Sequence, residues 1–404
     1  MTNIKNHNKW IISLILPPIW SAIVSLVEIF KNKKWNRIVP FLFAYCLIIV
    51  YSIQSYDNRI RFLNILKMNE TSSILDDHIL SWIIYSIKQY CDIGCTLFFA
   101  LYAFLCLLLY YEVYRILYNK FNAVIALMII LTISVKNLYD LNYSTLSIVF
   151  LLYCMLRFSR DCLKYLFSII GCYIIHPVAL IVLLFSTPLY YLLKNNKFKL
   201  VYLYVCALIF ICSTLFVINN QFNGIGIEMI DAYIDKGNSY LSQDNFWADK
   251  SNLEMSLSLK AFSFFEGFLN LFFGVMTIFT VKKKLLPPML SAMIISSSIL
   301  YFATINTVTF NERFCSAIFI YGMTVFPLFT KVGFKWISYR KIACLCVFMY
   351  FSSFYFHPLV QTLIFGPKGF PEEVSIRKYY IPSIILLDVN DFGLSDSYLK
   401  KEMK

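Results

Sequence analysis

The chain has 404 residues, of which 59% are hydrophobic, 18% aromatic and only 15% charged. Soluble domains usually carry about 25% charged residues, so this composition excludes an ordinary soluble enzyme and a disordered chain. The 36 basic and 23 acidic residues give a net charge of +13. Because the basic residues lie in short breaks between apolar runs, we expect membrane topology to explain the charge and expect no nucleic-acid partner.

The apolar runs predict an all-α, polytopic integral membrane protein with about 12 transmembrane helices, since one spanning helix needs about 20 apolar residues. Residues 1–404 are expected to form a single transmembrane domain. The predicted spans are 11–30, 38–55, 93–112, 121–138, 144–156, 163–176, 177–193, 200–218, 259–281, 285–305, 313–330 and 342–356.

The basic residues predict the orientation of these spans. Successive connections between the spans lie on alternate sides of the membrane, so they form two sets. One set holds 19 Lys and Arg in 43 positions, whereas the other set holds 15 in 150. The first set is therefore expected in the cytoplasm. The large exterior connections are then 56–92, 219–258 and the C-terminal segment 357–404. The cytoplasmic connections are short and contain no nucleotide-binding motif, so an activated substrate delivered by the membrane is the expected energy source.

The first group of candidate site residues follows the second predicted span. Asp57, Arg59 and Arg61 supply one carboxylate and two guanidinium groups at the expected outer surface. One guanidinium group can donate two parallel hydrogen bonds to a phosphate group, so this segment could bind a diphosphate. The alternative is an interfacial anchor, in which the Arg side chains reach the lipid headgroups.

His176 is the second candidate. It precedes Pro177 inside an otherwise apolar stretch and is expected at an outer turn between two short spans. An ionisable residue at this depth suggests function, and histidine is a suitable general base near neutral pH. The alternative is a histidine that satisfies a helix end beside a proline.

Five further residues, at three places in the chain, complete the set. Asn311 and Arg313 enter a late span from outside, where they either bind substrate or cap the helix. Glu266 lies inside a span, where a lone acid should face a polar cavity and act as a base or as a partner for Arg. Asn142 and Tyr143 lie in a short exterior connection, where the amide and the ring could bind sugar; Tyr143 equally suits an interfacial aromatic belt.

Residues 157–181 resemble a segment of the EpsG-like and Wzy-type polysaccharide polymerases. A basic turn is followed by a short apolar span and then by His-Pro-Val-Ala-Leu at 176–180. The exterior Asp57-Asn58 with Arg59 is similar to the acidic, aromatic first loop of that family. Arg313-Phe314 is similar to its late Arg-aromatic pair. Family members often carry an Arg where this chain has residues 140–144, so the phosphate contact must come from another residue here.

The resemblance implies a GT-C-like membrane glycosyltransferase of the bacterial inner membrane, with its active site facing the periplasm. Such enzymes join oligosaccharide repeat units carried on undecaprenyl diphosphate and extend O-antigen or capsule. On this reading Arg59, Arg61 and Arg313 bind the diphosphate, and His176, Asp57 or Glu266 is the base. Membrane lipid and a chain-length regulator protein are the expected partners. No acidic metal-binding motif stands out, so neither a metal nor another cofactor is expected.

Three other functions fit the same composition. A flippase or other transporter of lipid-linked oligosaccharide would have a similar number of spans, although no internal repeat of the kind common in transporters is evident. An O-antigen ligase would use the same donor with a different acceptor, whereas an acyltransferase would need its histidine reachable from the cytoplasm. A non-enzymatic partner in an export complex is the last alternative.

Overall fold

The structure is a computed structural model that describes residues 16–32, 34–52, 79–90, 95–133, 138, 142–217, 257–281, 286–304 and 308–329. Regular structure in these residues is entirely helical, so the predicted all-α class is confirmed for them. Helices occur in eleven of the twelve predicted spans, and the twelfth, 342–356, lies outside the described residues. The connections 219–256 and 357–404 lie outside them too.

Apolar length separates one helix from the others. Within the described residues, the stretch Phe98–Leu117 is long and apolar enough to cross a bilayer. Six other stretches are apolar but shorter, at 10–17 residues. A short helix that spans a membrane needs local thinning of the bilayer or cover from neighbouring helices. These properties are consistent with membrane association.

The described helices belong to two compact units that divide between Val149 and Phe150, inside helix α9. The first unit contains a hairpin of two helices joined by a 3-10 turn, and α6 packs on its second helix. Its elements are α2 (Pro18–Asn32), η1 (Trp35–Arg37), α3 (Ile38–Ser52), α5 (Ile79–Tyr90), α6 (Cys95–Leu117), α7 (Ala123–Thr132) and the start of α9 (Tyr143–Arg157).

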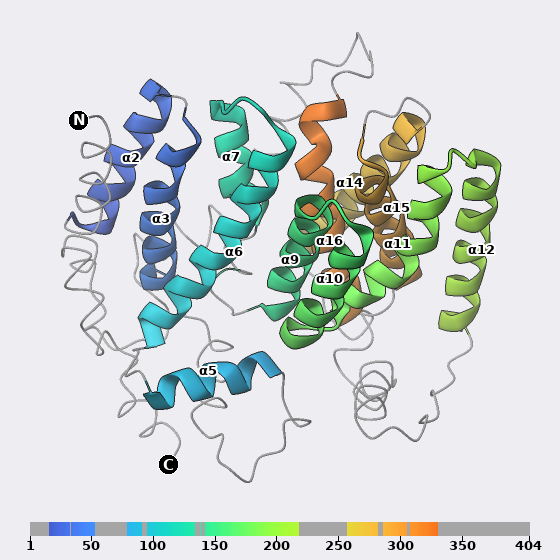
Figure 1. The fold of residues 1–404 in the computed structure, drawn as a ribbon, viewed down its shortest axis with the longest axis horizontal. Helices are drawn as coiled ribbons and strands as arrows, with labels where there is room; N and C mark the ends of the chain where they lie inside the picture. Colours follow the sequence, from blue (N-terminus) through green and yellow to red (C-terminus); the bar gives the residue numbers. More distant parts are fainter. Residues whose placement is uncertain are drawn as a thin grey trace. The chain divides into compact units, whose positions relative to one another are not determined.

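Helix α5 lies within the predicted connection 56–92. Its 12 residues span about 18 Å at 1.5 Å per residue, well short of the roughly 30 Å hydrocarbon core. Ile83 and Ile87 are exposed one turn apart, while Ser81 and Ile84 are buried. Figure 1 shows α5 running across the direction of α3. Its apolar residues recur at helical rather than continuous spacing, so a search for long apolar runs does not detect it.

The second unit is built around α15. This helix contacts α11, α12, α14 and α16 (Figure 1). Its residues from Met289 to Ser298 are all buried. A helix that is covered on all sides can be apolar around its whole circumference. The helices of this unit are α10 (Asp161–Ile175), α11 (Val178–Lys194), α12 (Phe198–Val217), α14 (Leu257–Val281), α15 (Pro288–Ala303) and α16 (Val308–Phe329).

Helix α16 starts earlier than the sequence predicts. The expected span begins at Arg313, whereas the helix begins at Val308, so Arg313 lies in its second turn. No glycine or proline interrupts residues 308–312, and the polar residues Asn311 and Glu312 therefore continue the helix rather than ending it.

Candidate functional site

His176 occupies the two-residue turn between α10 and α11, where the sequence predicts it. The residue is buried, with 7% exposure. Its backbone N–H donates to the carbonyl oxygen of Cys172 at 2.8 Å and closes α10. Its ring Nδ1 accepts a hydrogen bond from the backbone N–H of Val178 at 3.2 Å. The imidazole thus satisfies one of the otherwise unpaired N–H groups at the start of α11.

This hydrogen bond constrains the proton on the ring. An acceptor Nδ1 carries no hydrogen, so neutral His176 carries its hydrogen on Nε2. The helix-end alternative raised by the sequence is therefore present in the structure. The donor of the neutral ring is then Nε2–H.

Asn270 joins three helices of the second unit. Its side chain is buried on α14, where Nδ2 donates to Sγ of Cys315 on α16 at 3.6 Å. Its backbone oxygen accepts from Oγ of Ser298 on α15 at 3.2 Å. A Cβ on Gly274 would lie only 2.6 Å from Ser298 Oγ, so the absence of a side chain at Gly274 lets α14 and α15 approach closely here. A polar contact thus links α14, α15 and α16 within the apolar unit.

Asn311 completes the end of α15. Its Nδ2 donates to the carbonyl oxygen of Tyr301 at 2.9 Å, and the residue is buried. Thr304 Oγ1 donates to the carbonyl oxygen of Leu300 at 2.8 Å. The Asn311 amide thus supplies a donor to the Tyr301 carbonyl at the helix end, where carbonyl groups lack intrahelical partners, whereas the Leu300 carbonyl also accepts from the Thr304 backbone N–H at 3.0 Å. Asn311 is therefore held at the end of α15, and Arg313 follows it on α16, half-buried.

His176 and the start of α16 lie at the same end of the second unit. Figure 1 shows the α10–α11 turn and the first turns of α16 at one end, with the α11–α12 turn at the other. Cys172, one turn before His176, is an electrostatic neighbour of Tyr321 on α16. Arg313 precedes Tyr321 by eight residues, or about 12 Å of helix. The interaction of Cys172 with Tyr321 therefore places α10 beside α16.

Asn142 and Tyr143 belong to the first unit. Asn142 Oδ1 accepts from Ser144 Oγ and, at 3.4 Å, from the backbone N–H of Thr145, so Asn142 caps α9. Tyr143 is buried, its hydroxyl lies 3.3 Å from Oγ of Ser81, and its ring contacts Tyr102 at 6.2 Å between centroids. Asn142 thus caps α9, and Tyr143 holds this helix to α5 and α6.

Four predicted site residues have side chains outside the part of the chain that the structure describes. Asp57, Arg59 and Arg61 lie outside the described residues. Glu266 belongs to α14, with a side chain outside the described set. It is followed one turn later by Asn270, the buried polar residue described above.

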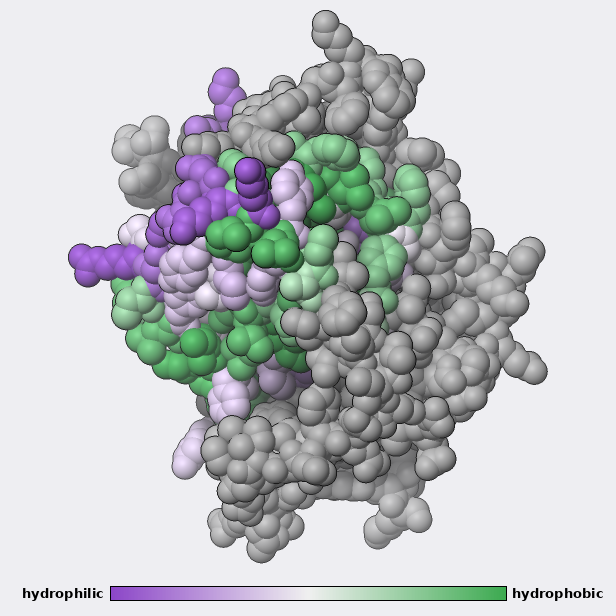
Figure 2. Space-filling model, turned by 90° about the vertical axis from the view of Figure 1, so that its right-hand side faces the viewer, coloured by the Kyte–Doolittle hydropathy of each residue, from purple (hydrophilic) through white to green (hydrophobic). Residues whose placement is uncertain are grey.

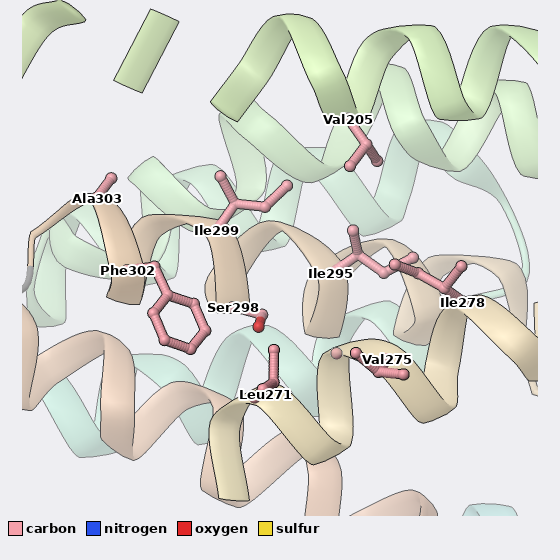
Figure 3. A pocket seen from close by; sticks show the side chains of 10 residues that line it. Val205, Leu271, Val275, Ile278, Ile295, Ser298, Ile299, Phe302 and Ala303 are labelled. Atoms are coloured by element: carbon pink, nitrogen blue, oxygen red, sulfur yellow. The ribbon is translucent and has the colours of Figure 1, made fainter. Parts of the chain in front are cut away.

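An apolar groove of about 340 Å³ lies between α12, α14 and α15. Nine of its ten lining residues are apolar, and the tenth is Ser298, which donates within the protein (Figure 3). The groove passes exposed residues of α14, including Leu271 and Val275, and ends at Phe302 and Ala303. One end therefore lies beside Thr304 and the end of α15 that Asn311 completes.

Sequence reasoning missed the groove and the residues that bind Asn270 and Asn311. The serines of α15 interrupt a strongly apolar span at 296–298, which is a detectable signal, but their partners are set by tertiary contacts. The groove can hold an apolar chain, and one of its ends lies beside the buried amide of Asn311 at the end of α15. Comparison of the chain with protein-family models, curated proteins and solved structures finds no match.

Proposed function

We propose that the chain is a multi-pass protein of the bacterial inner membrane, with about 12 transmembrane helices, that polymerises lipid-linked oligosaccharide repeat units at the periplasmic face. The observation that carries this proposal is the groove that ends at Phe302 and Ala303 beside the polar end of α15. A substrate with a long apolar chain, a diphosphate and a sugar needs this combination of an apolar channel and polar groups.

The groove has a suitable chemistry for the polyprenyl chain of such a donor. An engineered apolar cavity of about 150 Å³ binds benzene, so about 340 Å³ accommodates several isoprenoid carbons. The α15 wall from Ile295 to Ala303 runs for about 12 Å. The remaining chain would lie along the exposed apolar side chains of α14, such as Phe268 and Phe279, in the bilayer.

The reaction exchanges one bond at the anomeric carbon for another. The bond from this carbon to the diphosphate breaks, and the electron pair leaves with the lipid diphosphate. A hydroxyl of the acceptor repeat forms the new bond and gives its proton to a base. Arg313, with Arg59 and Arg61, would stabilise the charge on the leaving diphosphate. Nε2–H of His176 would donate in the same region, which leaves Asp57 or Glu266 as the base.

The test is a chain-length ladder of the surface polysaccharide in cells that carry single variants. The Arg313→Ala protein should still be found in the membrane, but the surface polysaccharide of these cells should consist of single repeats instead of long chains. Arg115→Ala is the matched control, because Arg115 is exposed on α6 and pairs with Glu112 at 2.7 Å. A wild-type ladder from Arg313→Ala would remove Arg313 from the site. If the purified protein transports labelled lipid-linked sugar but does not lengthen the sugar chain, the protein is a flippase and not a polymerase.

A further inference from the structure

Six basic residues gather at the end of the second unit that lies opposite His176. They come from the α9–α10 and α11–α12 turns and are accompanied by a single acid, Asp161. We call them the basic turn patch: Arg157, Arg160, Lys164, Lys194, Lys197 and Lys199. Five of the six are exposed, and Lys164 is half-buried. The two turns are more than 30 residues apart in sequence, so their association is a property of the fold.

Asp161 joins the two turns. Its Oδ2 accepts from Lys194 Nζ at 2.8 Å, and its Oδ1 accepts from Tyr190 Oη at 3.1 Å and from Lys164 Nζ at 3.4 Å. The two lysine Nζ atoms lie 5.4 Å and 6.0 Å from the centroid of the Tyr190 ring. The only acid of these turns is thereby engaged by the protein itself, and the start of α10 is fixed to the end of α11.

The α11–α12 turn has a defined backbone. Asn196 adopts a positive φ of 56°, a conformation that asparagine tolerates better than most residues. The Lys197 N–H donates to the Leu192 carbonyl oxygen at 2.9 Å, and the Asn196 N–H donates to that of Leu193 at 3.1 Å. This pair of bonds is the Schellman ending of a helix. Lys197 and Lys199 are consequently presented from an ordered turn rather than from a long loop.

Four side chains of the patch remain available to a ligand. Within the described residues, no hydrogen bond or ion pair engages the side chain of Arg157, Arg160, Lys197 or Lys199. Large apolar side chains are exposed directly beyond them, among them Leu166 and Phe167 on α10 and Leu203 on α12. Figure 2 shows hydrophilic residues gathered next to hydrophobic surface on this side of the unit.

We propose that the basic turn patch binds the phosphate of anionic phospholipid headgroups. The exposed apolar side chains beside it would contact the acyl chains of the same lipids. Clusters of four to eight Lys and Arg at the end of a membrane helix attract anionic lipid, with about 1 kcal/mol for each basic residue, or roughly fivefold in affinity. This site is separate from the proposed polymerase site and does not depend on it, because it lies at the opposite end of the second unit (Figure 1).

The experiment measures lipid binding by the full-length protein in detergent, with dioctanoyl phosphatidylglycerol and dioctanoyl phosphatidylcholine as probes. The wild-type protein should prefer the anionic lipid at low salt, and the preference should shrink as salt is raised to about 0.5 M, where charges are screened beyond about 4 Å. Equal affinity for the two lipids at low salt would overturn the proposal without any variant.

A triple variant locates the site. Arg160→Gln, Lys197→Gln and Lys199→Gln together should weaken phosphatidylglycerol binding by at least roughly tenfold and leave phosphatidylcholine binding unchanged. The matched control replaces Lys31, Lys34 and Lys120 by Gln, three exposed basic residues of the first unit. Retained anionic binding in the first triple variant, or an equal loss in the control, would assign the lipid preference to overall charge and overturn the proposed patch.

Discussion

The ring of His176 accepts a hydrogen bond at Nδ1 from the backbone N–H of Val178, over 3.2 Å, across the proline that separates them. Pro177, at the N-cap of α11, has no side-chain acceptor, so the histidine supplies the capping group for the first turn of α11. The ring therefore has two separable properties: an acceptor that stabilises a helix and an Nε2–H that neutral imidazole can donate.

Two substitutions separate these properties. His176→Asn places an amide oxygen near the position of Nδ1 and keeps the cap but removes the distal N–H. We expect near wild-type thermal stability and a loss of elongation of roughly 10²-fold, which is typical when a donor to a developing negative charge is removed. His176→Gln should behave in the opposite way, with some elongation retained and a stability cost of about 0.5–2 kcal/mol from the lost cap.

The measurements are the melting temperature of the purified variants and the rate of repeat addition to a lipid-linked acceptor. Full elongation by His176→Asn would reduce His176 to a helix cap, with no part in the reaction.

The groove makes a second prediction about substrate binding. Val275 lines it and is exposed, so Val275→Trp should fill part of the 340 Å³ and hinder entry of an apolar chain. Leu184→Trp is the control, because Leu184 is exposed on α11 and does not line the groove. We expect a raised KM for the lipid-linked donor in the first variant and an unchanged KM in the second. An equal KM for both variants would place the lipid chain elsewhere.

Much of the fold was predictable because a helix that is buried in lipid or protein appears in the sequence as a continuous run of apolar residues. The exceptions have physical causes. Helix α5 has only 12 residues, and serine, lysine and glutamine interrupt its apolar residues, so it resembles a connection. Helix α16 extends over Asn311 and Glu312 because neither residue stops a helix. Boundaries depend on capping groups that come from neighbouring residues, such as Asn142 before α9.

The candidate site was predictable only in part. His176 is conspicuous because a lone imidazole beside a proline interrupts an apolar stretch, and the structure places it in the expected turn. The partners of Asn270 and Asn311 were not predictable, since Ser298, Cys315 and Tyr301 lie on other helices and meet these amides only through packing. The groove has no sequence signal, because it is formed by the separation of three apolar helices.

Asp161 predicts a stability change at acid pH. The pKa of this carboxyl lies below its ordinary value of 3.8. The largest cause is the hydrogen bond from Lys194, and the hydrogen bond from Tyr190 and the positive charge of Lys164 lower the pKa further. The ionised form therefore stabilises the folded chain above about pH 3.8, and this contribution is lost as the pH falls through the lowered folded pKa.

Asp161→Asn removes the titrating group. The stability advantage of the wild type over this variant should be constant near neutral pH and should vanish in acid below pH 3.8, as measured by melting temperature against pH. An advantage that persists undiminished to the lowest pH would mean that Asp161 contributes through packing rather than through its charge.

A pair of helical glycines tests the packing of α14 against α16. A Cβ on Gly322 would overlap the ring of Phe273, whose atoms near the backbone cannot move far. Gly322→Ala should therefore destabilise the second unit by about 1–3 kcal/mol. A Cβ on Gly267 would meet only the Tyr301 hydroxyl at 3.7 Å, an ordinary contact. Gly267→Ala should be neutral or stabilising by up to about 1 kcal/mol, because alanine is the better helix residue.

Melting temperatures of the two purified alanine variants measure the difference. Phe273→Leu in the Gly322→Ala background should restore part of the lost stability, since a smaller side chain makes room for the new methyl group and neighbouring substitutions are expected to couple. If Gly322→Ala melts like the wild type, or if Phe273→Leu adds its full cost to it, then α14 and α16 do not meet through this glycine and ring. The contact between Asn270 and Cys315 on the same two helices would then need an independent basis.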